Sequence, residues 1–270
     1  ALGTSTPKPT LVTVDQNGTG LFTTIEEAIN WSSEGDTVLV SSGTYRENLS
    51  LGDKNIHLAS YFLTTGDTSY VRSTIIDGQQ SGATVYFTGN GNKDFSISGF
   101  TIKGGYGENQ NGSGININNS GTVKIDRVIV QENFNQWPGG GGILVYSTDS
   151  VLVSNSIIRN NNSNNNISGV MTGPSEVNYF ELSNSIVHGN GGSVFLENTR
   201  ESRIISSSLL GRINLHGSIN DSTLIMNSII KYDGDYCENI LTKVSENSGS
   251  YALINSLLVT NANSCSNVSY

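Results

Sequence analysis

Apolar and polar positions follow one short pattern that returns seven times along the chain: an apolar residue, small or polar residues, two apolar residues and a polar residue. The copies are ISGFTIK (97–103), IDRVIVQ (125–131), VSNSIIR (153–159), LSNSIVH (182–188), ISSSLLG (205–211), IMNSIIK (225–231) and LINSLLV (253–259). Their starts are separated by 28, 28, 29, 23, 20 and 28 residues. A period of this size is typical of repeat proteins, so equivalent residues of successive repeats should stack into rows.

Each repeat contains two or three short apolar runs that are typical of strands, and no helical periodicity. ISGFTIK, for example, is followed by a loop and SGININ (113–118), and IDRVIVQ by a glycine-rich loop and GILVY (142–146). Strands, turns and loops at a fixed period predict a parallel β-helix, in which main-chain hydrogen bonds join the coils. The alternative is a β-propeller, but its blades need roughly 40 residues or more.

The third and fourth letters of the pattern predict two ladders of polar side chains. Asn tolerates the left-handed backbone of a sharp corner. The third letter is Asn155, Asn184, Asn227 and Asn255, and we expect an internal Asn ladder there. The fourth letter is Ser156, Ser185, Ser208, Ser228 and Ser256, and we expect an inward ladder of small side chains. No base accompanies these serines, so both rows are interpreted as structural.

The N-terminal segment differs from the repeats. TTIEEAINWSSEGDTVLV (23–40) places Ile25, Ala28 and Ile29, together with Trp31, at helical spacing, and Thr23 with Glu26 fits a capping box. A short helix there would cover the open apolar end of the first coil. We therefore expect a polar tail at 1–10, a cap with a short amphipathic helix at 11–36, and β-helix coils at 37–270.

The cap segment carries a family resemblance. DQNGTGLFTTIEEAI (15–29) and GDTVLVSSGTYREN (35–48) resemble the N-terminal cap and first coil of the pectin-lyase-like superfamily, as found in pectin methylesterases and secreted bacterial β-helix proteins. Gly43, Tyr45 and Glu47 match its structural G-x-Y-x-E element. The resemblance implies an all-β, single-stranded right-handed parallel β-helix (solenoid) with a short N-terminal capping helix. The catalytic motifs of pectin methylesterases and polygalacturonases have no counterpart in the chain, so no catalytic residue is carried over.

Composition and cysteine placement narrow the function classes. Fourteen basic and 23 acidic residues give a net charge of −9, which argues against a nucleic-acid binder. No apolar run reaches membrane-spanning length. Cys237 and Cys265 each lie six residues after a repeat string, and stacked coils are about 4.8 Å apart, which predicts a disulfide. Two unpaired thiols are the alternative. A disulfide would indicate an extracellular or cell-surface protein, and the resemblance points to a bacterial one.

Alternation along the strand after each loop predicts one outward row whose side chains could take part in a reaction. Its members should be Asn118, Tyr146, Gly173, Glu197, His216 and Lys243. Glu197, His216 and Lys243 would then lie on consecutive coils, each roughly 5 Å from the next. Proton transfer or glycosidic cleavage needs such groups close together, so these three and Tyr146 are the candidate catalytic residues. The alternative is three solvated charges on a sheet surface.

Aromatic residues lie in the loops that precede this face. Tyr106 and Trp137 are in long glycine-rich loops and could stack on sugar rings, or equally fold back onto the coil beneath them. Asp233, Asp235 and Glu238 offer oxygens to calcium but lack the spacing of a known calcium loop. We therefore expect no cofactor, with calcium as the alternative at that loop.

The last letters of the pattern predict two further outward rows. The seventh letter is mostly basic and includes Lys103, Arg159 and His188, which could attract an acidic polysaccharide. If the Ser row is internal, one of the two apolar letters between the serine and the seventh letter faces outward. Ile157, Ile186 and Ile229 would then form an apolar stripe for a second copy or an adjoining domain. The alternative is a bend that turns both apolar letters inward.

Two function classes fit these rows. In the first, the protein is a secreted carbohydrate-active β-helix that binds or cleaves an extended, anionic polysaccharide along its outer face, and any cleavage would be that of a lyase or glycoside hydrolase. In the second, it is a non-catalytic surface, adhesion or structural module of a larger secreted protein. Ice binding fits less well, because no outward Thr ladder appears in the repeats.

Overall fold

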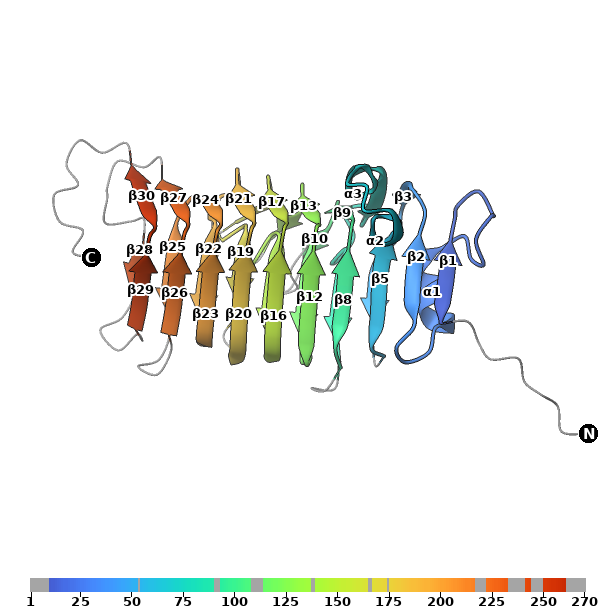
Figure 1. The fold of residues 1–270 in the computed structure, drawn as a ribbon, viewed down its shortest axis with the longest axis horizontal. Coiled ribbons are helices and arrows are strands. Elements are labelled where there is room, and N and C mark those ends of the chain that lie inside the picture. The colour runs from blue at the N-terminus through green and yellow to red at the C-terminus, as the bar shows by residue number, and fades with distance from the viewer. Residues whose placement is uncertain are drawn as a thin grey trace, which may run out of the picture.

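The computed structural model describes residues 10–52, 54–89, 93–107, 114–136, 139–164, 167–173, 175–216, 222–232, 241–243 and 250–260. In these ranges the chain winds as a single right-handed parallel β-helix (Figure 1). Successive coils lie side by side along the long axis, and the first and last described strands, β1 and β30, are at opposite ends of the stack. The predicted fold class is therefore confirmed. None of the helices in the described ranges is long and apolar enough to cross a membrane.

Three long parallel sheets and one short sheet form the walls of the described coils. Sheet A contains, in order, β1 (Leu11–Val14), β2 (Thr37–Val40), β5 (Ile56–Ser60), β8 (Phe95–Ser98), β12 (Thr122–Asp126), β16 (Thr148–Ser154), β20 (Val177–Ser183), β23 (Thr199–Ile205), β26 (Ser222–Met226) and β29 (Ser250–Ile254). Sheet B contains β3 (Gly43–Tyr45), β6 (Thr74–Asp77), β9 (Thr101–Lys103), β13 (Ile129–Gln131), β17 (Ile157–Arg159), β21 (Ile186–His188), β24 (Ser208–Leu210), β27 (Ile229–Tyr232) and β30 (Leu257–Thr260). Sheet C contains β4 (Leu49–Leu51), β7 (Val85–Thr88), β11 (Ile115–Asn118), β15 (Ile143–Tyr146), β19 (Val170–Thr172), β22 (Val194–Glu197), β25 (Ile213–His216) and β28 (Leu241–Lys243). Sheet D contains β10 (Tyr106–Gly107), β14 (Phe134–Asn135) and β18 (Asn162–Ser163).

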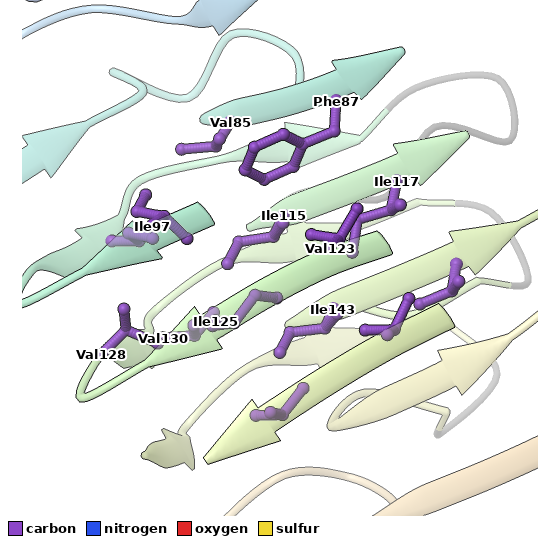
Figure 2. Close-up of a cluster of buried hydrophobic side chains, with 14 of the residues drawn as sticks. Val85, Phe87, Ile97, Ile115, Ile117, Val123, Ile125, Val128, Val130 and Ile143 are labelled. Carbon is purple, nitrogen blue, oxygen red and sulfur yellow. The ribbon is translucent and has the colours of Figure 1, made fainter. Parts of the chain in front are cut away.

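The core is a column of β-branched and aromatic side chains that all three long sheets contribute. Figure 2 shows Val85, Phe87 and Ile115 of sheet C together with Ile97 and Val123 of sheet A. All five are buried. Alternate residues of each strand point inward, and stacking in register repeats the same inward position on every coil. The period in the sequence therefore produces one continuous core.

The inward Ser ladder is present, with one member misassigned from the sequence. The hydroxyl of Ser185 accepts the N–H of Ser156 at 3.1 Å, and the hydroxyl of Ser207 accepts the N–H of Ser185 at 3.2 Å. Ser207, not Ser208, occupies the ladder, because β24 pairs Ser208 with the outward Ile186. Each hydroxyl thus satisfies a buried N–H at the corner between sheets A and B.

The sequence pattern indicated one Asn row for both the corner position and the internal ladder, but two different rows of asparagines occupy them. Asn155, Asn184, Asn227 and Asn255 have φ between 49° and 52°, as expected for corner residues, but they are exposed. The internal ladder is formed by Asn133 and Asn161, which are 1% exposed, with Asn190 beyond them. Asn133 Nδ2 donates to Asn161 Oδ1 at 2.8 Å, and Asn161 Nδ2 donates to Asn190 Oδ1 at 3.1 Å. This ladder lies at the next corner, after sheet B.

Helix α1 (Ile25–Trp31) covers the first coil in the predicted place, but its cap lies one residue later than expected. Thr24 is the N-cap, and its hydroxyl accepts the N–H of Glu27. The Glu47 carboxylate accepts the N–H groups of Ile25 and Glu26 at 3.0 and 2.8 Å. Carboxylates at a helix N-terminus satisfy unpaired donors and complement the helix dipole. The structural role implied for Glu47 is therefore visible in its contacts.

An insertion between β5 and β6 interrupts the coil pattern. It contains the short helices α2 (Phe62–Thr65) and α3 (Ser69–Ser73), which lie at one edge of the stack near β3 and β9 (Figure 1). Thr101 Oγ1 donates to the Val71 carbonyl at 2.8 Å, and the Tyr61 and Tyr70 rings are 6.0 Å apart. These contacts anchor the insertion on the outer side of sheet B.

Candidate functional site

Tyr146 marks the part of sheet C where the predicted outward row is best formed. It ends β15 and pairs with Asn118 of the preceding coil. The next coil has Gly173 at this position, and a Cβ atom there would overlap the Tyr146 ring. The ring therefore lies along the sheet, in contact with the Gly173 backbone, and the residue stays half-buried. Only glycine leaves room for this orientation of the ring.

Glu197 follows in the same row, on the far side of Gly173. It ends β22 and is half-buried. Burial, and then the negative charge of Glu197, raise the pKa of Tyr146 to about 12. The phenol is therefore a hydrogen-bond donor at neutral pH, and the Glu197 carboxylate is an acceptor. A hydroxyl-rich ligand that lies across Gly173 can use both groups.

The structure keeps His216 in this row and removes Lys243 from it. His216 pairs with Glu197, as expected from the alternation. Lys243 pairs with Leu215, one position away from His216. The main-chain register on the last of these coils therefore differs by one residue from the expected one, and the geometry of the site rests on Tyr146 and Glu197.

The predicted stacking residues have different outcomes. Tyr106 is half-buried, and its ring is 5.5 Å from the ring of Phe134 on the next coil, with an interplanar angle of 32°. The two rings form an aromatic pair on sheet D. Trp137 lies outside the described residues. So do Cys237 and Cys265 of the predicted disulfide and the acidic loop at 233–238 considered for calcium.

The basic row lies on sheet B and is partly neutralised. Lys103 Nζ is 3.7 Å from an Asp77 carboxylate oxygen. Arg159 Nε and Nη2 donate to Gln131 Oε1 at 2.9 and 2.7 Å. Arg159 also pairs in register with His188, which is half-buried. Asp77 therefore offsets part of the charge of Lys103, whereas the neutral Gln131 orients Arg159 and leaves its charge in place.

The apolar stripe is also on sheet B. Ile157 is half-buried, whereas Ile186 and Ile229 are 42% and 48% exposed. Ser208 interrupts the stripe between them, because Leu209 is fully buried. The bend that would turn both apolar letters inward is therefore absent from these described coils.

Sequence reasoning missed a polar network on the outer face of sheet A. Tyr179 donates its hydroxyl to Glu181 at 2.6 Å, and Arg203 pairs with Glu201 at 2.7 Å while lying 5.8 Å from the Tyr179 ring centroid. The alternation in VNYFELS (177–183) and TRESRII (199–205) was the signal that could have placed these residues together. His57 was missed as well, and its Nε2 lies 3.0 Å from Ser98 Oγ. Among the described residues, no group of three His, Cys, Asp or Glu side chains could hold a metal ion.

Comparison with known proteins identifies the fold. No protein-family model matches the chain, and no curated sequence matches it. Escherichia coli YbhC is similar in structure, with a TM-score of 0.51 and 14% identity over 95% of this chain and 86% of that one. A pectin methylesterase variant in complex with a hexasaccharide has a TM-score of 0.50 and 12% identity over 93% of this chain and 80% of that one. Together with the parallel sheets, these similarities show that the chain has the right-handed parallel β-helix fold.

Proposed function

We propose that this protein binds an extended polysaccharide along the outer face of sheet C. The single observation that carries the proposal is the half-buried Tyr146 ring, which lies over Gly173 of the next coil, with Glu197 one coil beyond Gly173. An aromatic ring supplies a platform for the apolar face of a sugar ring, and a donor and an acceptor beside it fix the hydroxyl groups. In-register stacking provides a straight face on which consecutive sugar units can lie.

The fold supports the proposal without carrying it. A pectin methylesterase that shares the fold binds a hexasaccharide. Tyr106 and Phe134 form a second aromatic surface on sheet D, and the basic row on sheet B at Lys103, Arg159 and His188 would attract acidic chains toward the protein. A location outside the cell or at the cell surface would fit binding of this kind. We propose binding as the activity, and the protonated Tyr146 hydroxyl would serve it as a hydrogen-bond donor.

Affinity electrophoresis in gels that contain polygalacturonate, alginate or a neutral glucan tests the proposal. We expect retardation of the native protein by at least one acidic polysaccharide. Tyr146→Ala should weaken binding about tenfold, because it removes the platform. Gly173→Ala should have a similar effect without removing Tyr146, because the added methyl group displaces the ring.

Tyr179→Phe is the matched control, since Tyr179 is a half-buried tyrosine beside a carboxylate on sheet A. It should leave retardation unchanged. Migration that no polysaccharide changes, or equal retardation of the native protein and Tyr146→Ala, would refute the proposal. Glu197→Gln in a reducing-sugar assay then separates binding from cleavage, because any turnover at this site should be lost while the fold is kept.

A further inference from the structure

A cleft lies between the α2–α3 insertion and the corners of the next coils. Its volume is about 690 Å³, within the range of small-molecule sites. Val71 of α3 forms one wall, and Ile129 and Ile157 of sheet B form the floor. The Thr101 hydrogen bond to the Val71 carbonyl holds this wall against sheet B. The cleft is therefore built from anchored elements, and it lies apart from the sheet C face.

Two arginines border the apolar floor. Arg72 comes from the last turn of α3 and Arg127 from the corner after β12. Arg72 is exposed, and among the described residues no carboxylate lies within ion-pair distance of it. Asp67 is on the same rim, but its carboxylate accepts the N–H of Ser69 at 2.8 Å. Arg127 has an ion-pair partner in Asp126, so Arg72 is the guanidinium at this rim that no described carboxylate pairs with, and its donors favour an anion.

Arg127 occupies a backbone position that its side chain disfavours. Its φ is 49°, in the left-handed region. The equivalent corners of the neighbouring coils carry residues with small or short polar side chains, namely Gly99, Asn155, Asn184, Ser206, Asn227 and Asn255. A long non-glycine side chain is strained at such a position, and such residues persist mainly where the surroundings determine them. An outlier of this kind is an observation from which a function can be inferred.

The surroundings of Arg127 orient its guanidinium. It forms an ion pair with Asp126, and it lies 5.0 Å from the centroid of the Phe62 ring at the start of α2. Asp126 is itself held by Ser154 Oγ and Asn155 Nδ2, each at 2.7 Å. The Arg127 side chain remains 42% exposed, so a planar donor group is fixed at the cleft with donors left for a ligand.

We propose that this cleft binds a small organic acid, with its carboxylate between Arg72 and Arg127 and its apolar body on Val71, Ile129 and Ile157. The class follows from the combination of an apolar floor and a cationic rim in one cavity. A fully polar anion would leave the floor uncovered, and an uncharged apolar molecule would leave the guanidinium donors without a ligand.

Calorimetry with benzoate and cyclohexanecarboxylate as probes tests this assignment, with benzamide as the uncharged control. We expect the two carboxylates to bind at millimolar concentration and benzamide to bind at least about tenfold more weakly. Arg127→Asn introduces the residue that the next coils use at this corner, so the fold should be kept. Arg127→Asn and Arg72→Gln should each weaken benzoate binding about tenfold or more, whereas Arg200→Gln, far along sheet A, should have no effect.

Several results would overturn the assignment. These are the absence of carboxylate binding, equal binding of benzoate and benzamide, or unchanged binding by Arg127→Asn with an unchanged unfolding midpoint. A second copy of the chain as the occupant would appear as a mass that rises with protein concentration in light scattering and that excess benzoate does not lower. That result would also contradict the proposal. Neither outcome depends on whether sheet C binds a polysaccharide.

Discussion

Replacing Asn161 with alanine should be one of the most destabilising single changes in the described coils. Asn161 is 1% exposed. Its Oδ1 accepts the N–H and the Nδ2 of Asn133 at 3.2 and 2.8 Å, and its Nδ2 donates to the Val130 carbonyl at 3.0 Å. Alanine leaves the Asn133 N–H and the Val130 carbonyl buried without these partners. Each such group costs about 1–3 kcal/mol, so we expect a loss of about 4 kcal/mol of unfolding free energy.

Asn184→Gly is the matched control, because Asn184 belongs to the other Asn row. It is exposed, has a φ of 49°, and makes a side-chain bond to Asn155 of 3.5 Å. Glycine adopts the left-handed corner readily, so the change should stay within about 1 kcal/mol. The assay is urea denaturation followed by circular dichroism, with native-state hydrogen exchange at the sheet B corner as a second readout, since solenoids can unfold locally. A loss below about 1 kcal/mol for Asn161→Ala, or a larger loss for Asn184→Gly, would refute the ladder argument.

Three further predictions concern the cap, the pH dependence and the apolar stripe. Glu47→Ala should lower the unfolding free energy by about 1–2 kcal/mol, because two N–H groups of α1 lose their acceptor, and hydrogen exchange at Ile25 should rise; unchanged exchange would contradict this. Burial, and then the charge of Asp15, raise the pKa of Tyr45 from 10.0 to about 12, so the unfolded chain loses this proton first and stability should fall between about pH 10 and about pH 12. Tyr45→Phe should flatten that part of the denaturation-midpoint profile, and an unchanged slope would argue against the shift. Ile186→Thr should change the unfolding free energy by less than about 0.5 kcal/mol, because Ile186 is exposed, whereas Val187→Ala should cost about 2 kcal/mol in the same denaturation experiment.

The fold was predictable because the repeat pattern records the coil geometry directly. Alternation and the spacing of the strings place Val153, Leu182 and Ile225 on the inner face of sheet A, and all three are fully buried. Nothing in this step depends on interactions between distant segments. The cap helix was predictable for the same reason, since apolar spacing and a Thr-x-x-Glu signal are local, although the adjacent Thr23 and Thr24 made the capping residue ambiguous.

Register failed where the sequence offers equivalent neighbours. Three consecutive serines precede Leu209 and Leu210, so the repeat string was aligned one residue too late on this coil. The buried side chain of Leu209 fixes the correct alignment. The same kind of slip put Lys243 beside His216 instead of beside Leu215. A strand has a side-chain period of two, so one residue of error exchanges the inner and outer faces.

The candidate site could be predicted only in part. Tyr146 and Glu197 were identified by alternation, but the orientation of the ring depends on the missing Cβ of Gly173 on a different coil. Arg127 lies at the third letter of its repeat string, but Arg72 comes from the α2–α3 insertion, which no periodic pattern describes. Their proximity arises from tertiary packing, through Phe62 and Val71.

The most direct test of polysaccharide binding on sheet C is to map a bound oligosaccharide on the protein by NMR. A hexasaccharide prepared from the acidic polysaccharide that retards the native protein should be titrated into isotope-labelled native protein and into labelled Tyr146→Ala. If sheet C is the binding face, amide shift changes should be concentrated at the ends of β11, β15 and β22, around Asn118, Tyr146, Gly173 and Glu197. These changes should be lost in Tyr146→Ala. Shift changes confined to sheet A around Tyr179 and Arg203, or the same changes in both proteins, would contradict it.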